Sequence, residues 1–512
     1  MNNFIDDLIN INNAVNEVAW GWIGLILLLG TGLLTSILTK FFQITHFKHW
    51  ISKTIGSVFS KDTHKKEDRG SVSQFQALCT ALAATIGTGN IAGVAAAICA
   101  GGPGAVFWMW VAAFLGMMTN YSENILGIYF RRKNEDGEWS GGAMYYLKDG
   151  LGSYKGLKKI GMFFAYLFSV FAILASFGIG NMGQINKITL NIESAFFENI
   201  NAPIIAGASL VNWIIGLVLM VIGGFIILGG LQRIASFAEK VVPFMALVYI
   251  LGALIIILLN FKQLPIMFFS IFKFAFGPKA VAGGIFGSTI QNLLNTMKNG
   301  CKRGVFSNEA GLGSSVMVHS NSNVKEPVKQ GLWGIFEVFA DTIIVCSMTA
   351  FVVLSSGVID LTTGLCAEGT DDATLVARSF GIHFGKPGEW FVAVAVLLFA
   401  FTTVMGWSHY GSKAVEFIFG AKGAKIYKVI FVLSMILGAI MTSSIAWDIS
   451  DTFNGLMMIP NLIGVVSLSP LIIKITNNYI DRKFKGKNIE PLLSYDPEIQ
   501  KEHVNLVKNG EE

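Results

Sequence analysis

Eleven long apolar stretches limit this chain to one class of structure. Each is long enough for a helix to cross the roughly 30 Å hydrocarbon core of a bilayer, and backbone in lipid must satisfy its hydrogen bonds internally, which favours helices. The chain of 512 residues is 53% hydrophobic and 14% charged, so it is more apolar than a soluble core requires. We therefore expect an all-α integral membrane protein with 11 transmembrane helices. The stretches are 18–38, 71–100, 104–130, 160–186, 203–229, 236–260, 278–297, 331–357, 390–411, 426–446 and 454–473.

The basic residues predict how the chain crosses the membrane. If the acidic N-terminus lies outside, 32 of the 38 Lys and Arg residues fall on the cytoplasmic side and six fall outside. Because cytoplasmic loops carry the excess of basic residues, we expect a multi-pass protein of the cell membrane with its N-terminus outside and its C-terminus in the cytoplasm. Residues 1–17 lack the basic region of a signal peptide, which favours an extracellular amphipathic segment. Residues 18–70 then form an extra transmembrane helix and a basic cytoplasmic loop.

Charge and motifs exclude several other functions. The net charge of +5 is spread over short loops and not gathered on one face, so we expect no nucleic-acid partner. Residues 178–183 match GxGxxG, but they lie in an apolar stretch with no preceding strand. GxxxxGK[ST], HExxH and GxSxG do not occur, and the five cysteines show no CxxC spacing. We expect neither an enzyme nor a covalently bound cofactor.

The stretch 71–100 carries polar residues and glycines at its centre, in the run Thr85-Ile86-Gly87-Thr88-Gly89-Asn90. Two glycines let the backbone leave helical geometry. Broken backbone at membrane depth persists only where protein or a water-filled cavity supplies its hydrogen bonds. The stretch therefore predicts a discontinuous helix that lines a solute site. We number the ten stretches from 71–100 onward as core helices 1 to 10.

The topology allows two halves of opposite orientation. Core helix 1 runs outward and core helix 6 runs inward, so residues 71–260 and 261–476 could form repeats of five helices each, followed by a polar cytoplasmic tail at 477–512. A matching break in core helix 6 is expected at 282–289, which reads AGGIFGST. Paired glycine-interrupted helices indicate a transporter's binding site. The alternative is that these glycines only allow close helix packing.

A second polar run at 303–315, RGVFSNEAGLGSS, begins with Arg303 and closely follows Lys298 and Lys302. Charges at the bilayer centre are costly, so we expect this run at the cytoplasmic mouth, where Arg303, Asn308 and Glu309 could form a gate. Glu337 and Asp341 in core helix 7 lie one helical turn apart. They could pair with Arg303 or Lys329, and a proton relay is the alternative.

Adjacent threonines in core helix 8, Thr402 and Thr403, suggest an ion site. Their hydroxyl oxygens suit a hard cation such as sodium, although threonines in helices often bond back to their own backbone. Trp407 follows one turn later and could line the solute pocket or anchor the helix.

Several motifs together resemble the alanine/glycine:cation symporter family, also called sodium:alanine symporters. They are FQALCTALAATIGTGNIAGVAAAI at 75–98, GGPGAVFWMW, SGGAMYYL at 140–147, RGVFSNEAGLGSS and TTVMGWSHYG at 402–411. The resemblance covers about residues 18–475. It implies the amino acid, polyamine and organocation superfamily, whose LeuT-type fold is a 5+5 inverted repeat with discontinuous core helices 1 and 6. The helix at 18–38 is then an extra N-terminal one.

The resemblance also implies a binding site. The substrate carboxylate would be held by the backbone N–H groups of Thr88 and Gly89 at a half-helix N-terminus, which suits an anion. The ammonium group would face the two helix breaks, and Asn181 and Gln184 would add polar contacts. A sodium ion would bind the carbonyl oxygens of Ala83 and Ile86 and the hydroxyl groups of Thr402 and Thr403. The implied substrate-binding residues are Thr85, Thr88, Gly89, Asn90, Gly283, Phe286, Gly287 and Trp407.

The expected function is therefore sodium-coupled import of alanine or glycine by alternating access, with Na⁺ as the coupling ion. A monomer in the lipid bilayer suffices for this, and the sequence leaves the oligomeric state open. A proton-coupled amino-acid symporter that uses Glu123, Glu337 or Asp341 is the first alternative. A membrane sensor is the second, but the tail of some 36 residues is too short for a typical signalling domain.

Overall fold

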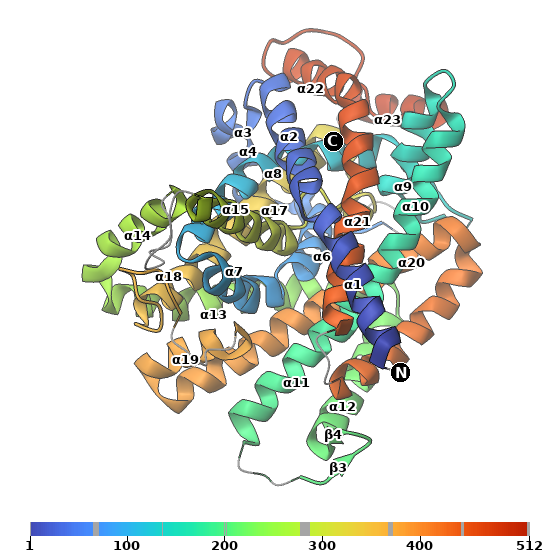
Figure 1. Ribbon diagram of the computed structural model, residues 1–512. Helices are drawn as coiled ribbons and strands as arrows, with labels where there is room; N and C mark the ends of the chain where they lie inside the picture. The colour runs from blue at the N-terminus through green and yellow to red at the C-terminus, as the bar shows by residue number, and fades with distance from the viewer. Residues whose placement is uncertain are drawn as a thin grey trace.

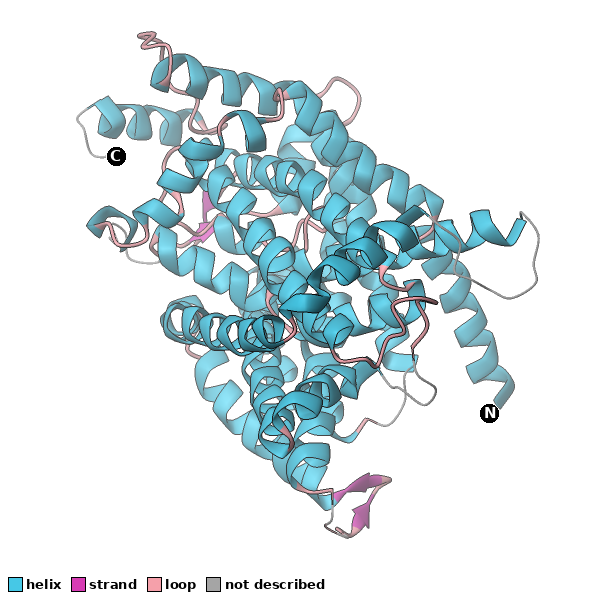
Figure 2. Ribbon diagram, turned by 90° about the vertical axis from the view of Figure 1, so that its left-hand side faces the viewer, coloured by secondary structure: helices cyan, strands magenta, loops and turns pink. Residues whose placement is uncertain are grey.

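The computed structural model describes residues 2–64, 71–135, 137–198, 200, 202–276, 287–366, 372–441 and 445–508. Helices dominate these residues, as Figure 2 shows. Two short antiparallel hairpins are also present. In one, β1 (Arg132–Lys133) pairs with β2 (Trp139–Ser140), and in the other β3 (Ile204–Ile205) pairs with β4 (Ala208–Ser209). The expectation of an all-α protein is confirmed.

The helices follow the order of the apolar stretches. The first long helices are α1 (Asn2–Ala19), α2 (Trp22–Leu38), α6 (Gln74–Thr85), α7 (Val94–Gly101) and α8 (Gly104–Tyr129). The later ones are α10 (Lys158–Phe177), α11 (Gly183–Phe196), α12 (Leu210–Ile227), α13 (Leu231–Leu259), α14 (Leu264–Phe276), α15 (Gly287–Asn308), α17 (Pro327–Val338), α18 (Ser347–Ser355), α19 (Asp372–Phe384), α20 (Lys386–Ile440), α21 (Ile445–Ser467), α22 (Ser469–Lys483) and α23 (Pro497–Lys508). Shorter helices are α3 (Phe42–Thr45), α4 (Phe47–Lys53), α5 (Lys61–His64), α9 (Ala143–Tyr145) and α16 (Val316–His319).

The number of spans differs from the expected eleven. Within the described residues, seven helical stretches are long and apolar enough to cross a membrane, or eight if the bent pair α6–α7 is one span. Helix α8, which corresponds to the expected stretch 104–130, is not among these candidates. Two further features lower the count. Helix α20 runs through two expected stretches and is kinked at Gly420 (φ 72°), and α15 carries Lys298, Lys302 and Arg303. The exact number of 11 transmembrane helices is therefore not confirmed.

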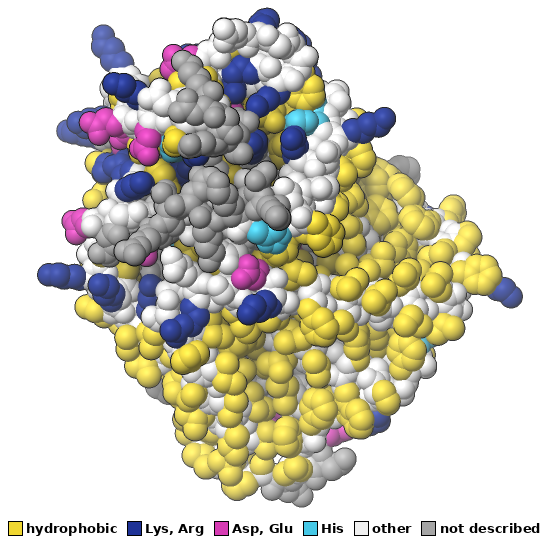
Figure 3. All heavy atoms as spheres, turned by 180° about the vertical axis from the view of Figure 1, so that it is seen from behind, with side chains coloured by type: hydrophobic (Ala, Val, Ile, Leu, Met, Phe, Trp, Pro, Cys, Tyr) yellow, Lys and Arg dark blue, Asp and Glu magenta, His cyan; other side chains and the backbone are white. Residues whose placement is uncertain are grey.

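The outer surface is that of a membrane protein. Large apolar side chains face outward, for example Phe225 on α12 at 70% exposure and Phe269 on α14 at 67%, and a soluble protein rarely exposes such surface in large patches. Figure 3 shows hydrophobic side chains over most of the lower part of one face, while Lys and Arg gather at its upper end. That end carries α22 and α23, and the β3–β4 hairpin lies at the opposite end (Figure 1).

Core helix 1 is discontinuous, as predicted. Its first half, α6, begins at a capping box in which Ser73 and Gln76 satisfy each other's backbone N–H groups. The helix stops at Thr85, passes through a π-helical turn at Gly89–Gly93, and resumes as α7 at an angle of 53° to α6. The glycines therefore break the helix and do not only allow close packing.

A second break in the described residues follows α15. Most of the expected break at 282–289 lies outside the described residues, including Gly283 and Phe286. Gly287 begins α15, which continues without interruption to Asn308. The chain then leaves helical geometry over Glu309–Ser315 before the short helix α16. The described break is thus the polar run that we expected at the cytoplasmic mouth.

Candidate functional site

The break in core helix 1 is held open by side-chain hydrogen bonds. Asn90 accepts the backbone N–H of Gly87 at 2.9 Å, so the amide closes the turn that follows α6. The N–H of Thr88 donates to Oε1 of Gln184 in α11 over 3.4 Å. These N–H groups precede the second half of the helix, whose first backbone donors have no helical partners. Side chains thereby satisfy them inside the protein, as membrane depth requires.

The second break owes its shape to three residues with positive φ. They are Glu309 (φ 57°), Gly311 (φ 95°) and Gly313 (φ 74°). Left-handed backbone is unfavourable for a residue with a side chain, so Glu309 adopts it because its surroundings hold it there. Its carboxylate accepts the hydroxyl of Ser314 at 2.5 Å, and Asn308 accepts the N–H of Ala310 at 3.0 Å.

The two breaks lie against each other. A Cβ atom added to Gly89 would come within 3.1 Å of the Cα of Ser307 and 3.2 Å of the Phe306 ring. Glycine at 89 therefore lets α15 approach the first break closely. The end of α15 therefore packs against the centre of core helix 1, a contact that we did not predict for the 303–315 run.

A small cavity of about 10 Å³ lies where the breaks meet. Its size matches about one water molecule, so an amino acid can enter only when the lining groups move apart. Of the expected substrate-binding residues, it brings together Thr85, Gly89 and Trp407. Its lining residues are Ala84, Thr85, Gly87, Gly89, Ile179, Gln184, Phe306, Glu309, Thr403 and Trp407.

Sequence reasoning missed Phe306 and placed Glu309 in a gate. Both belong to the motif RGVFSNEAGLGSS, whose glycines were the signal that could have identified the second break. Asn90, which we expected beside the substrate, is not among the lining residues. Its Nδ2 donates to the carboxylate of Asp341 at 2.6 Å. The amide therefore links the break to core helix 7.

Thr403 joins core helix 1 to α20. Its hydroxyl donates to the carbonyl oxygen of Ala83 at 3.1 Å and also contacts that of Phe399 at 3.0 Å. Thr402 bonds back to Phe399 at 2.9 Å, and its hydroxyl faces Met245. The two threonines therefore differ, because only Thr403 reaches across to α6, which ends close to the expected carbonyl ligand Ile86.

Comparison with known proteins identifies the chain's family. The model of the sodium:alanine symporter family matches residues 5–492. The chain belongs to the sodium:alanine symporter family. Sodium/alanine symporter AgcS of Methanococcus maripaludis is 40% identical over 484 residues, which cover 94% of this chain and 100% of that protein. A putative sodium/proton-dependent alanine carrier protein of Bacillus subtilis, YrbD, is 35% identical over 501 residues and covers 94% of each chain.

A solved structure confirms the expected LeuT-type fold. MhsT in complex with L-phenylalanine aligns with a TM-score of 0.52 at 15% identity, covering 80% of this chain and 99% of that one. The family match and the relative AgcS confirm the expected resemblance, and the protein is a sodium-coupled amino-acid symporter of the membrane.

In this symporter, the carboxylates of core helix 7 have partners other than those expected. Glu337 accepts from His319 at 2.9 Å and from Asn120 at 3.2 Å. Asp341 accepts from Asn90 and from the hydroxyl of Thr342 at 2.8 Å, and the Arg303 guanidinium lies 5.6 Å from the centre of the Phe306 ring. The structure therefore does not support a gate in which Arg303 pairs with Glu337 or Asp341.

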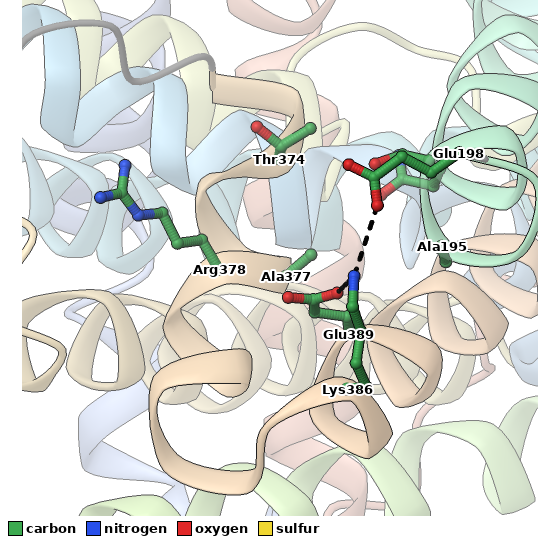
Figure 4. Close-up of a pocket in the computed structure, with 9 residues that line it drawn as sticks. Ala195, Glu198, Thr374, Ala377, Arg378, Lys386 and Glu389 are labelled. Carbon is green, nitrogen blue, oxygen red and sulfur yellow. Dashed lines mark hydrogen bonds and ion pairs between the residues drawn. The ribbon is translucent and has the colours of Figure 1, made fainter.

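A separate pocket of about 150 Å³ lies between the end of α11, α19 and the start of α20 in the symporter. Figure 4 shows Lys386 between Glu198, at 3.4 Å, and Glu389, at 2.9 Å, while Arg378 points away from this group. None of its lining residues belongs to the cavity at the breaks. Because Lys386 and Glu198 are mostly exposed, this ion pair contributes little to stability.

Proposed function

We propose that this symporter imports a small neutral amino acid, alanine or glycine, together with sodium by alternating access. The cavity between the two breaks is the observation that carries the proposal. It combines a carboxylate, an amide and broken backbone with two large aromatic side chains, Phe306 and Trp407. A zwitterion with a small side chain matches that combination of charge, polarity and limited room.

Each end of the amino acid has suitable partners. Its carboxylate binds the backbone N–H groups of Thr88 and Gly89 and takes over the N–H that now donates to Gln184. Its ammonium group binds the carboxylate of Glu309, which lines the cavity and is 2% exposed. A buried carboxylate without a cation is costly, and the ammonium group compensates that charge.

Size selection comes from side chains that crowd the cavity. Gly180, in the π-helical turn before α11, lies against Trp407, since a Cβ atom there would come within 2.5 Å of the tryptophan Cβ and Cγ. The indole cannot move toward Gly180 without a clash. It therefore limits the length of the substrate side chain.

The coupling sodium ion binds between α6 and α20. Ala83 and Ile86 provide carbonyl oxygens and Thr403 provides its hydroxyl oxygen, while Thr402 joins after its side chain rotates away from Met245. Neutral oxygen ligands of this kind suit a hard cation. The 3.1 Å contact between Thr403 and Ala83 supports the site because it already brings two of its ligands together. Bound sodium then stabilises the packing of core helix 1 on α20 and completes the cavity.

Loop charges support the orientation in the cell membrane, with the N-terminus outside and the C-terminus in the cytoplasm. The repeats are residues 71–260 and 261–476. Labelling of single cysteines from each side of the membrane, placed at Gly207 in the β3–β4 hairpin and at Lys487, tests this orientation.

Uptake into proteoliposomes tests the proposal. Radiolabelled alanine should accumulate under an inward sodium gradient and not under equimolar potassium, with glycine competing and phenylalanine failing to compete. Equal uptake in sodium and potassium would refute sodium coupling. No uptake of any small neutral amino acid would refute the assigned substrate.

Proton coupling is the second candidate, and a specific observation favours it. Glu309 places a carboxylate in the cavity itself, where it could carry a proton in place of an ammonium partner. An imposed pH gradient without sodium should drive uptake in that case, and Glu309→Gln should abolish the pH response.

A further inference from the structure

Glu123 lies in α8, is 1% exposed, and is not among the residues that line the cavity. Its carboxylate instead contacts the second break. The N–H of Gly311 donates to Oε2 over 3.4 Å. Glu123 therefore satisfies a backbone donor that the break leaves without a helical partner.

The backbone of the break turns the N–H of Gly311 toward an anion. Residues with positive φ recur at 309, 311 and 313, and such a sequence can turn successive N–H groups toward one side to form a concave anion site. Here the anion is a side chain of the same protein. A carboxylate accepts N–H groups about twice as strongly as a neutral oxygen does.

Asn461 in α21 completes the contact from the other side. Its Nδ2 donates both to Oε1 of Glu123 and to the carbonyl oxygen of Gly311, the latter at 2.8 Å. Its Oδ1 accepts the hydroxyl of Tyr146. A Cβ atom on Gly313 would come within 2.7 Å of the Asn461 amide, so glycine at 313 is required for this approach.

Glu123 and Glu309 thus have different roles at the loop formed by residues 309–315. Glu123 accepts the N–H of Gly311 from the loop, whereas Glu309 belongs to the loop and lines the cavity. We propose that Glu123 is a positioning residue which, together with Asn461, holds the second break in the shape that presents Glu309 to the transported amino acid. The role of Glu309 in binding the amino acid rests on the proposed function, whereas the stabilisation of the break by Glu123 and Asn461 does not.

An exchange of the two side chains tests the proposal in the full-length protein. Glu123→Gln puts an NH₂ donor among N–H donors, and Asn461→Asp puts a second carboxylate beside Glu123. Each single variant should speed amide hydrogen exchange at 309–315 at least tenfold and raise the KM for alanine at least tenfold, with a smaller change in kcat. The double variant again places an amide donor opposite a carboxylate, but the carboxylate at 461 cannot donate to the carbonyl oxygen of Gly311. It should therefore recover the exchange rate and the KM in part and fall between the single variants and the wild type.

Three results would overturn the proposal. They are wild-type exchange at 309–315 in Glu123→Gln, a double variant no better than the worse single variant, and a KM that is unchanged while the pH dependence of uptake disappears. The last result would make Glu123 a proton carrier. If Glu123→Gln does not fold, Glu123→Asp replaces it and should show a smaller change in the same direction.

Matched controls separate this inference from the proposed function. Glu198→Gln also removes a carboxylate, but in the exposed pocket of Figure 4, and it should change neither readout. Hydrogen exchange reports on the break whether or not alanine is the substrate. If alanine is not transported but exchange responds as expected, only the proposed substrate fails.

Discussion

The hydroxyl of Thr403 lies 3.1 Å from the carbonyl oxygen of Ala83, although the two residues are 320 positions apart. Glycine at 87 permits this approach, since a Cβ atom there would lie 2.3 Å from the Thr403 hydroxyl oxygen. The contact joins the broken helix to α20 at the proposed sodium site, so it offers a direct test of coupling.

We expect Thr403→Val to keep the shape of the side chain and lose the oxygen ligand. Sodium and substrate stabilise each other's binding by the same factor, so the variant should need more sodium for half-maximal uptake. At limiting sodium its affinity for alanine should fall roughly 5-fold or more. Uptake measured against sodium concentration checks this.

The matched controls are Thr403→Ser, which keeps the hydroxyl and should stay close to the wild type, and Thr402→Val. Because the Thr402 hydroxyl faces Met245, its loss should have a smaller effect than that of Thr403. An unchanged sodium requirement in Thr403→Val would contradict the proposed site.

We expect Gly180→Ala to reduce the uptake of alanine. The added methyl group would lie 2.5 Å from Cβ and Cγ of Trp407, and relief of such a clash costs about 1–3 kcal/mol or moves the indole into the cavity. Glycine, with the smaller side chain, should be affected less than alanine. Competition between the two amino acids measures the ratio.

Gly30→Ala is the control for this substitution, since nothing lies within 4 Å of a Cβ atom at that position in α2. It should leave uptake unchanged. If Gly180→Ala lowered alanine and glycine uptake equally, size selection by Trp407 would be refuted.

The break in core helix 1 was predictable from the sequence because its signal is local. Glycines beside polar residues in an uncharged stretch indicate that the helix is interrupted there. The run at 303–315 was expected at the cytoplasmic mouth because basic residues accompany it, and uncompensated charge in a membrane is costly. In the structure Lys302 forms an ion pair with the distant Asp451, and Arg303 lies over Phe306 in the same helix.

Contacts between distant residues explain what else could not be predicted. Gln184 enters the cavity from α11 and Glu309 from the second break, and the pairing of Glu123 with Asn461 spans 338 positions. No spacing in the sequence shows that such residues contact each other. The sequence shows only that each is a polar residue in an apolar stretch.

The C-terminal helix α23 should undock as the pH falls. Burial beside Arg131, Lys325 and Lys133 lowers the pKa of His503 to about 3, against about 6.5 when exposed. The undocked helix therefore takes up a proton below about pH 6.5, while the docked helix does so only near pH 3. Docking is at full strength above pH 6.5 and weakens progressively toward pH 3.

Hydrogen exchange at 497–508, measured from pH 7.5 to 4.5 and corrected for the intrinsic rate, checks this prediction. His503→Phe keeps an aromatic ring against Trp139, whose ring centre is 6.0 Å away, and should remove the pH dependence. Protection in the wild type that stays constant down to pH 4.5 would contradict it.

We expect Glu309 to bind the ammonium group of the transported amino acid. Loss of a hydrogen bond to a charged partner costs about 1.5–3 kcal/mol, so Glu309→Gln should weaken alanine binding roughly 10-fold or more. Binding of alanine to the purified protein, followed at saturating sodium, measures this.

Ser314→Ala is the control, since it removes only the hydroxyl that donates to Glu309 at 2.5 Å. It should have a smaller effect, because the carboxylate remains. Alanine affinity that is unchanged in Glu309→Gln would place the ammonium group elsewhere, against the carbonyl oxygens of the two breaks.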